Sequence, residues 1–255
     1  MVDVAATSWA AGSVFAVAVL CWIFSAIRKN VSIVDSLWSL MFLLMLSVYH
    51  LLADTSSPRA WLILALVAIW ALRLSVYITV RNHGQPEDHR YATIRRNNQP
   101  NFRFKSLYIV FGLQAALACF ISLPLLVAAS ASSPLGWIDF LGIGFWLTGM
   151  VFEVVGDYQL SHFKAQAHNR GEVLDTGLWR YTRHPNYFGE FMIWWGYFLL
   201  ALAAGGWWTV FSPLLMSFLL LKVSGVALLE TTIGERRPKY ADYIRRTNAF
   251  FPGRP

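Results

Sequence analysis

The sequence predicts an all-α integral membrane protein, built as a bundle of seven transmembrane helices, and three observations predict this class. Hydrophobic residues make up 56% of the 255 residues and charged residues only 14%, a balance that is rare in water-soluble domains. The hydrophobic residues gather in windows of about 20, the length that crosses the apolar core of a bilayer as a helix. The basic residues gather between alternate windows, as expected when they mark the cytoplasmic side.

Each of seven windows predicts one spanning helix. The first window has no basic residue ahead of it and no cleavage site followed by a soluble domain, so we expect it to be retained as a span. Cys21 and Cys119 both fall inside windows, which argues against a disulfide framework and against structural zinc. In chain order, the windows run Ser8–Ile27, Ile33–Ala53, Ala60–Val80, Leu107–Ala129, Gly136–Asp157, Tyr187–Ala204 and Trp207–Leu229.

The distribution of Lys and Arg predicts the orientation. Eighteen of the 21 basic residues lie in segments 28–29, 81–105 and 164–183 or after Glu230, and Arg59 alone lies in an alternate connection. By the positive-inside rule, the N-terminus is expected outside and the C-terminus in the cytoplasm. The membrane is expected to be a bacterial inner membrane, or the endoplasmic reticulum in a eukaryote. Because the net charge of +7 follows topology, we expect no nucleic-acid binding.

The chain shows no internal repeat, low-complexity linker or break in composition, so residues 1–255 are expected to form a single transmembrane domain. The tail, residues 230–255, alternates aromatic and basic residues and predicts an amphipathic helix along the cytoplasmic membrane surface. Folded back, this helix would cover the polar residues of the bundle and bring Arg245 or Arg246 to a phosphate group of a cofactor. The sequence does not predict the oligomeric state.

Charged residues inside the windows indicate a function, because a charge in the bilayer is costly. Seven of them, from five helices, fall in the predicted cytoplasmic halves. Each alone is also compatible with a snorkelling side chain or a structural ion pair, but together they predict a polar cavity open to the cytoplasm. They are Asp35, Arg73, Glu153, Asp157, Glu190, Lys222 and Glu230.

Helical spacing places several of these polar residues on shared faces. Residues four apart in sequence lie on one face of a helix, so three helices present polar pairs. Lys164, seven residues after Asp157, falls on the same side if that helix continues past the membrane. The pairs are Arg73 with Tyr77, Glu153 with Asp157, and Asn186 with Glu190.

Residues 177–190 read Gly-Leu-Trp-Arg-Tyr-Thr-Arg-His-Pro-Asn-Tyr-Phe-Gly-Glu and predict the start of a helix at Pro185. A helix N-terminus offers unpaired N–H groups and the positive end of a dipole, which suit a phosphate or carboxylate. Arg180, Arg183 and His184 add positive charge. An anionic ligand is therefore expected here, and contact of the arginines with lipid head groups is the alternative.

Glycines and histidines carry less information. Gly142, Gly144 and Gly149 lie inside the fifth window without a preceding strand, so they predict close helix packing and not a dinucleotide fingerprint. The six histidines show no spacing typical of metal ligands. We therefore expect no metal.

From Asp157 to Glu190 the sequence resembles the steroid 5-alpha-reductase-like membrane family, in particular a largely bacterial branch of it. The residues Asp157-Tyr-Gln-Leu, then Phe163-Lys164, resemble the family's segment that leads into a loop, and Asn186-Tyr-Phe-Gly-Glu190 resembles its helix-start motif. Arg73 with Tyr77 matches an Arg-x-x-x-Tyr pair of the family. Glu230, Tyr243 and Phe251-Pro252 resemble its tail.

The resemblance implies an NADPH-dependent oxidoreductase that reduces a carbon–carbon double bond conjugated to a carbonyl. Its substrate would be a hydrophobic, steroid- or lipid-like molecule that enters from the membrane. With the anionic site predicted at Pro185, the cofactor-binding residues are then expected to be Arg73, Tyr77, Asp157, Lys164, Arg180, Arg183, His184, Asn186, Tyr187, Glu190 and Arg246.

The resemblance also implies an acid on the second helix that polarises the substrate carbonyl, and Asp35 is the candidate. Hydride addition builds negative charge on the carbonyl oxygen, which a hydrogen-bond donor stabilises in a dry site. Burial raises the pKa of a carboxyl group, so a protonated Asp35 would be that donor. Steroid reductases carry a Gln-Glu pair and a tyrosine where this chain has Asp35 and Trp70, so an ordinary steroid substrate is not expected.

Two other function classes remain open from the sequence. Arg183-His-Pro-x-Tyr187 with a later Glu230 also resembles membrane methyltransferases of the isoprenylcysteine and phospholipid type, which bind S-adenosylmethionine. That cofactor carries a carboxylate and a cation instead of phosphates, and it leaves the Arg73–Tyr77 pair without a role. A non-enzymatic lipid-binding or transport protein would explain polar groups in the membrane but not the helix-start motif.

Overall fold

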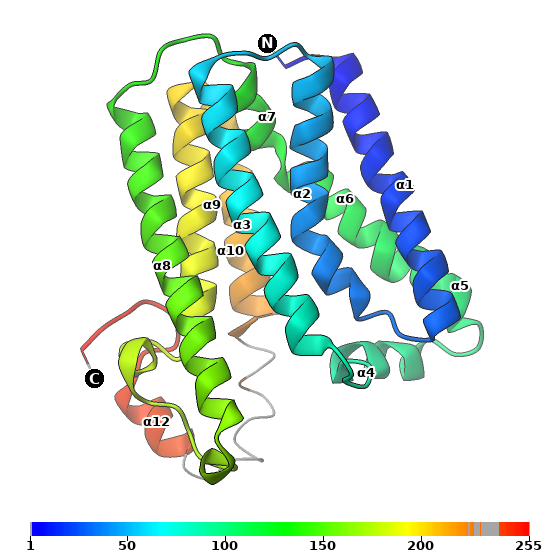
Figure 1. Ribbon diagram of the computed structural model, residues 1–255, viewed down its shortest axis with the longest axis vertical. Coiled ribbons are helices and arrows are strands. Elements are labelled where there is room, and N and C mark those ends of the chain that lie inside the picture. Colours follow the sequence, from blue (N-terminus) through cyan, green and yellow to red (C-terminus); the bar gives the residue numbers. More distant parts are fainter. Residues whose placement is uncertain (1, 224, 227–229, 231–239, 255) are drawn as a thin grey trace. The chain divides into compact units, whose positions relative to one another are not determined.

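The computed structural model describes residues 2–223, 225–226, 230 and 240–254, and the regular elements of those residues are helical (Figure 1). The chain divides into two compact units. The first comprises residues 1–135 and 204–206, and the second comprises residues 136–203 and 207–255.

In the first unit, α1 packs on α2, and four residues spaced four apart along α1 are buried, Ala6, Ala10, Val14 and Ala18. Ser57 begins α3, accepting a hydrogen bond from the N–H of Ala60 at 3.1 Å, and Pro58 occupies the first turn, as helix starts favour. The elements are α1 (Val4–Arg28), α2 (Ile33–Leu52), α3 (Pro58–Asn82), α4 (His89–Asn97), α5 (Phe102–Ser106), a π-helical segment (Leu107–Gly112), α6 (Leu113–Ile121) and α7 (Leu123–Ser130).

In the second unit, the antiparallel helices α8 and α9 lie side by side (Figure 1), and α12 lies near the end of α8. Three short 3₁₀ turns join the longer elements. The elements are α8 (Trp137–Ala165), turns at Ala167–Asn169 and Gly177–Arg180, α9 (Pro185–Ala203), a turn at Trp207–Val210, α10 (Phe211–Phe218), a π-helical segment (Leu219–Val223) and α12 (Tyr240–Arg246).

Helices α8 and α9 meet backbone to backbone at two glycine pairs. A Cβ atom on Gly149 would lie 2.5 Å from the carbonyl oxygen of Gly189, and one on Gly189 would lie 2.6 Å from that of Gly149. Gly142 and Gly196 form the second pair, at 2.9 Å and 2.8 Å. The prediction of close packing is confirmed for Gly142 and Gly149. It is wrong for Gly144, around which a Cβ would meet no atom within 4 Å.

Replacing Gly149 with alanine is expected to lower the free energy of unfolding by about 2 kcal/mol, because the added methyl group meets backbone that cannot move aside. Thermal unfolding of the protein in detergent, followed by circular dichroism, measures the change. Gly144→Ala is the matched control on the same helix and is expected to leave the melting temperature unchanged. Equal melting temperatures for the two variants would contradict the backbone contact.

Among the residues that the structure describes, five helices are long and apolar enough to cross a membrane, whereas the sequence predicted seven. They are α1, α2, α3, Phe102–Ser130 and α8.

The sixth predicted span coincides with α9, whose first turns carry Asn186 and Glu190 and are therefore less apolar. The seventh begins at Trp207, and the apolar helix there is described as far as Val223, which is fewer residues than a crossing requires. Residues 224 and 227–229 of that window lie outside the described residues.

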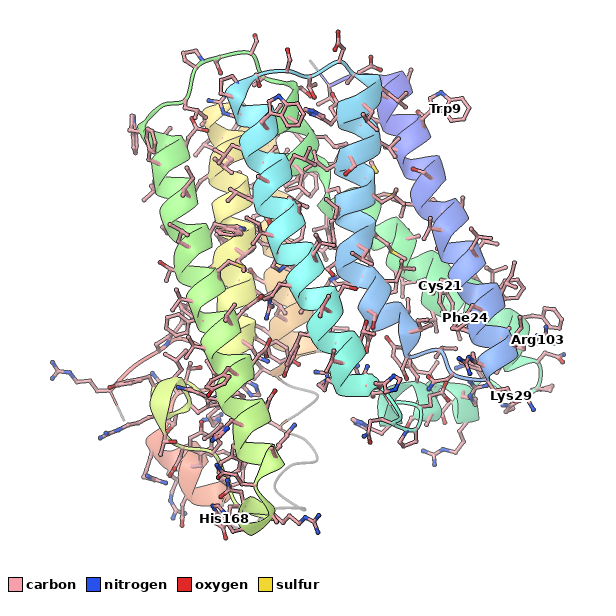
Figure 2. All side chains as sticks on the ribbon, in the orientation of Figure 1. Trp9, Cys21, Phe24, Lys29, Arg103 and His168 are labelled. Carbon is pink, nitrogen blue, oxygen red and sulfur yellow. The ribbon has the colours of Figure 1, made fainter. Side chains whose placement is uncertain are left out.

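Large apolar side chains face outward from these helices. On α1, Trp9, Leu20 and Ile27 are 72%, 64% and 69% exposed, and Figure 2 shows Trp9 and Phe24 projecting from the helix. Outward-facing apolar residues on several membrane-length helices need lipid as their solvent. The protein is therefore an integral, multi-pass membrane protein.

The predicted tail helix ends earlier than expected. Residues 231–239 lie outside the described residues, α12 is described over Tyr240–Arg246, and the chain after it is not helical. Phe250 instead packs edge-on against Phe188 and Phe191 of α9, with ring centroids 6.0 Å and 5.5 Å apart. The tail therefore returns to the start of α9.

Candidate functional site

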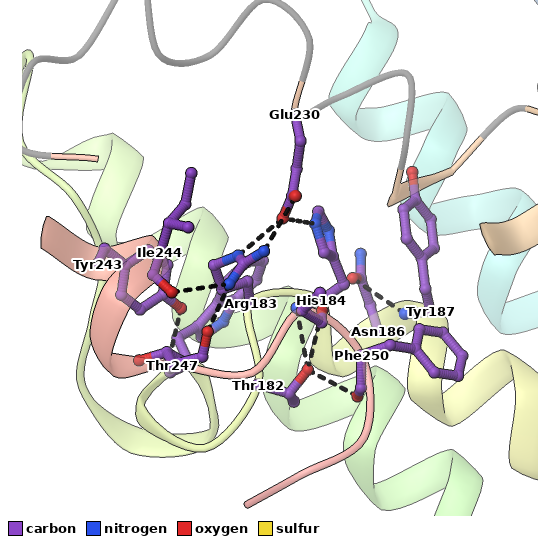
Figure 3. Close-up of polar contacts among 12 residues, drawn as sticks. Thr182, Arg183, His184, Asn186, Tyr187, Glu230, Tyr243, Ile244, Thr247 and Phe250 are labelled. Carbon is purple, nitrogen blue, oxygen red and sulfur yellow. Dashed lines mark hydrogen bonds and ion pairs between the residues drawn. The ribbon is translucent and has the colours of Figure 1, made fainter. Parts of the chain in front are cut away.

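The residues before α9 form a buried polar cluster (Figure 3). Arg183 donates from Nε and Nη2 to the two carboxylate oxygens of Glu230, at 2.7 Å and 3.0 Å. The Nε2 atom of His184 lies 3.2 Å from the same carboxylate. The side chains of Arg183 and His184 are only 7% and 5% exposed. We name Arg183, His184 and Glu230 the Arg183 cluster.

The Arg183 cluster also holds the tail (Figure 3). The Nη1 atom of Arg183 donates to the carbonyl oxygens of Ile244 and Thr247, and its backbone N–H donates to Asn248 at 2.9 Å. The hydroxyl of Thr182 donates to the carbonyl of Phe250 at 2.8 Å. Backbone carbonyl groups of the tail thus form one side of the cluster and accept hydrogen bonds from the guanidinium group of Arg183.

Neighbouring charges keep Arg183 and Glu230 ionised. Burial alone raises the pKa of the Glu230 carboxyl, but the hydrogen bonds and charges of His184 and Arg183 outweigh burial and lower it to about 2. Burial lowers the pKa of Arg183, yet Glu230 more than compensates and raises it. The internal anion Glu230 therefore stands beside the arginine and histidine that the sequence assigned to an anionic ligand. Buried Arg183 is also not available to lipid head groups.

The start of α9 meets α8 at predicted site residues. Gly156 of α8 leaves room for Pro185, and one position later the amide of Asn186 donates to the Asp157 carboxylate at 3.3 Å. Glu190, one turn along α9, is buried and accepts a hydrogen bond from Trp194 at 2.9 Å. The structure thus brings Asp157, Asn186 and Glu190 to one short stretch of two helices.

Two other predicted site residues, Tyr187 and Lys164, make different contacts from Asp157, Asn186 and Glu190. The ring of Tyr187 stacks on His184 with centroids 5.6 Å apart, which joins this tyrosine to the Arg183 cluster. Helix α8 does continue past Asp157, to Ala165, and Lys164 lies exposed in its last turn.

Arg180 and Arg246 line an open cleft of about 440 Å³, together with Asp175, Thr176 and Thr247. Both arginine side chains are exposed, and Nη2 of Arg246 lies 3.1 Å from Asp175 Oδ2. We name these five residues the two-arginine cleft. It collects two predicted phosphate-binding residues that are 66 positions apart in sequence.

In the first unit, Asp35 lies in the first turn of α2 and accepts two hydrogen bonds. Arg90 donates to Oδ2 at 2.6 Å and Tyr91 donates to Oδ1 at 2.5 Å. Arg90 also pairs with Asp88 at 3.0 Å. Both oxygens of the Asp35 carboxyl group are thus occupied as hydrogen-bond acceptors, and its role as the catalytic acid stays a prediction.

The group that keeps its proton beside Asp35 is Tyr91. This tyrosine is buried, and both burial and the negative charge of Asp35 raise the pKa of its hydroxyl above the usual range. Burial lowers the pKa of Arg90, but Asp35, Asp88 and Tyr91 together outweigh burial and raise it. Sequence reasoning missed Arg90 and Tyr91, and the only available signal was their place in the basic loop 81–105.

Arg73 and Tyr77 lie four residues apart on α3 and are both half-buried, as the spacing predicted. The guanidinium of Arg81 lies 5.8 Å from the centre of the Tyr77 ring. Among the residues that the structure describes, no group of three or more His, Cys, Asp or Glu side chains is placed to hold a metal ion.

Known proteins resemble this chain to different extents. An uncharacterised protein of Schizosaccharomyces pombe is 26% identical across 91% of this chain and 75% of its own length. The human and Macaca fascicularis proteins named 3-oxo-5-alpha-steroid 4-dehydrogenase 1 are 35% and 33% identical over 66 residues. That stretch is 26% of this chain, 26% of the human protein and 25% of the macaque protein, so the chain spans only about a quarter of these dehydrogenases.

No solved structure matches the chain. The family match is much more extensive, because it covers residues 21–247. The chain therefore belongs to the family described as "Protein of unknown function (DUF1295)".

Proposed function

We propose that the protein is a membrane-embedded, NADPH-dependent reductase of a carbon–carbon double bond conjugated to a carbonyl. The observation that carries the proposal is the meeting of Asp157, Asn186 and Glu190 at the start of α9. These residues belong to the segment that resembles the steroid 5-alpha-reductase-like family. The 66-residue similarity to 3-oxo-5-alpha-steroid 4-dehydrogenase 1 supports the same reaction class.

The residues of the second unit suit a phosphate-bearing nucleotide. Guanidinium groups bind phosphates through charge-assisted hydrogen bonds, and the two-arginine cleft presents two of them to solvent. The amide of Asn186 and the carboxylates of Asp157 and Glu190 supply donors and acceptors for hydroxyl and amide groups. When bound, NADPH supplies the hydride that is added to the β-carbon of the substrate.

The residues around Asp35 suit the stabilisation of negative charge on the carbonyl oxygen. Tyr91 and Arg90 both remain protonated at neutral pH, because their pKa values are raised. Asp35 holds both groups in place through its two oxygens, and the single hydroxyl proton of Tyr91 is donated to it. In this proposal Asp35 is a positioning residue that orients Arg90, and the further N–H groups of that guanidinium polarise the substrate carbonyl.

The substrate class and topology follow from the same proposal. A hydrophobic, steroid- or lipid-like enone would enter from the bilayer. With the basic loops in the cytoplasm, the N-terminus is outside and the C-terminus inside. An odd number of crossings, such as the five candidate spans, is consistent with those two ends.

Titration of the purified full-length protein with NADPH and with S-adenosylmethionine tests the proposal, because the two cofactors separate reductases from the methyltransferases that share the Arg-His-Pro motif. We expect NADPH to bind with a dissociation constant in the micromolar range and S-adenosylmethionine not to bind. Isothermal calorimetry measures both. Binding of S-adenosylmethionine without NADPH would overturn the proposal.

A further inference from the structure

We infer that the two-arginine cleft is a binding subsite for a phosphate monoester. The inference rests on the proposed function only for the ligand's identity, because NADPH carries such a group on its ribose and NADH does not. A membrane lipid with a terminal phosphate, such as phosphatidic acid, carries the same chemistry. The argument from the residues is independent of which of these molecules supplies the phosphate.

The walls of the cleft are fixed to one another. The hydroxyl of Tyr243 on α12 donates to the carbonyl of Trp179, and the indole N–H of Trp179 donates to Gly156 on α8 at 3.2 Å. The N–H of Leu178 donates to Gln159 on α8 at 3.1 Å. The backbone that carries Arg180 and the backbone that carries Arg246 are therefore both anchored before any ligand arrives.

The turn that carries Arg180 requires a glycine at its first position, Gly177. Gly177 has a backbone φ of 60°, and a Cβ there would lie 2.2 Å from the side chain of Gln159. A side chain at this position would be strained and would displace the glutamine that holds Leu178. The turn that aims Arg180 at the cleft thus depends on Gly177.

The two arginine side chains that line the cleft, Arg180 and Arg246, are cationic and exposed. The Arg246 guanidinium is oriented by Asp175 at 3.1 Å. Within the described part of the chain, the Arg180 guanidinium makes no hydrogen bond or ion pair. One carboxylate and two guanidinium groups leave the cleft with a net positive charge, and the hydroxyl of Thr176 adds a donor beside them. An anchored pair of arginines with spare donors suits a dianionic phosphate monoester more than a singly charged diester.

Ligand preference tests the subsite. In the full-length protein, Arg180→Gln and Arg246→Gln are each expected to weaken binding of NADPH about tenfold and to leave NADH binding unchanged, so that preference for NADPH falls about tenfold. Arg245→Gln is the matched control, because Arg245 lies on the same helix, is 73% exposed, pairs with Asp242 and does not line the cleft. It is expected to leave both dissociation constants unchanged.

Two further probes separate the sources of phosphate. Adenosine 2′,5′-bisphosphate tests a soluble nucleotide, and phosphatidylcholine vesicles with and without phosphatidic acid test a lipid. Loss of bisphosphate binding in both cleft variants supports a nucleotide ligand. Loss of only the preference for phosphatidic acid supports the lipid.

The failure of this inference is distinct from failure of the proposed function. If the wild type prefers NADPH to NADH and neither substitution changes the preference or the binding of any probe, the inference is overturned and the reductase proposal stands. If NADPH does not bind but a phosphate monoester binds through both arginines, the subsite stands and the reductase proposal falls.

Discussion

Replacing Arg183 with methionine is expected to release the tail, residues 240–254, from the start of α9 and to destabilise that contact by about 3 kcal/mol. Removing one partner of a buried ion pair leaves the other charge uncompensated. Here the loss also leaves the carbonyls of Ile244 and Thr247 and the carboxylate of Glu230 without their main donor. The lower end of the range for buried pairs applies, because Glu230 is 22% exposed.

Hydrogen exchange by mass spectrometry on peptides covering 240–254 measures this effect. Amide protection there is expected to fall about a hundredfold, since each tenfold corresponds to 1.4 kcal/mol. The control is Arg245→Met, which removes an exposed arginine of the same tail and should leave protection unchanged. Unchanged protection in Arg183→Met would show that the cluster does not hold the tail.

The stability of the contact between the tail and the start of α9 should depend on pH in the acid range. The pKa of Glu230 in the folded protein is about 2 and its usual value is 4.5, so the folded state binds fewer protons than the unfolded state between these values. Its stabilising contribution is complete above about pH 4.5 and is lost as the pH falls towards 2. In the wild type, amide protection of residues 240–254 should fall as the pH falls from about 4.5 towards 2. In Arg183→Met this pH dependence should be much weaker.

Replacing Asp35 with asparagine is expected to lower turnover of an enone at least a hundredfold while leaving the affinity for NADPH nearly unchanged. The substitution removes the negative charge that holds Arg90 and Tyr91, and loss of one oriented donor to a developing oxyanion typically costs about 100- to 1,000-fold in rate. This prediction depends on the reductase proposal. The affinity for NADPH should be preserved because Arg180 and Arg246, the arginines of the two-arginine cleft, belong to the second unit, whereas Asp35 belongs to the first.

Steady-state oxidation of NADPH, with any enone that the wild type reduces, measures the effect. Asp88→Asn is the matched control, because Asp88 also pairs with Arg90 and asparagine still caps the helix that Asp88 begins. If the two variants lose turnover equally, Asp35 acts only by holding the loop in place. If Asp35→Asn turns over normally, Asp35 has no part in the reaction.

The elements that depend on local sequence could be predicted well. Apolar runs are sufficient to place α1, α2, α3 and α8, because a helix in lipid satisfies its own backbone groups. Gly142 and Gly149 share a helix face since they lie two turns apart, whereas Gly144 is rotated to the other side. Only the face of α8 that contacts α9 requires glycines for close packing of the two backbones, and the sequence does not show which face of α8 that is.

Contacts between distant segments account for what could not be predicted. A positively charged helix start has the same sequence whether a ligand or the chain itself supplies the anion, and here Glu230 supplies it from 47 positions away. Asp35 is a second example. Its partners Arg90 and Tyr91 lie 55 and 56 positions away, so no local sequence pattern places them beside it.

The glycine contacts between α8 and α9 have a mechanical consequence. Helices that touch through side chains can slide by changing rotamers, but backbone in contact with backbone has no such freedom. We therefore expect helices α8 and α9 to move as one rigid body, which keeps the distance between Asp157 and Asn186 constant. If a ligand binds at the start of α9, as proposed, any rearrangement that admits it would have to come from outside this helix pair.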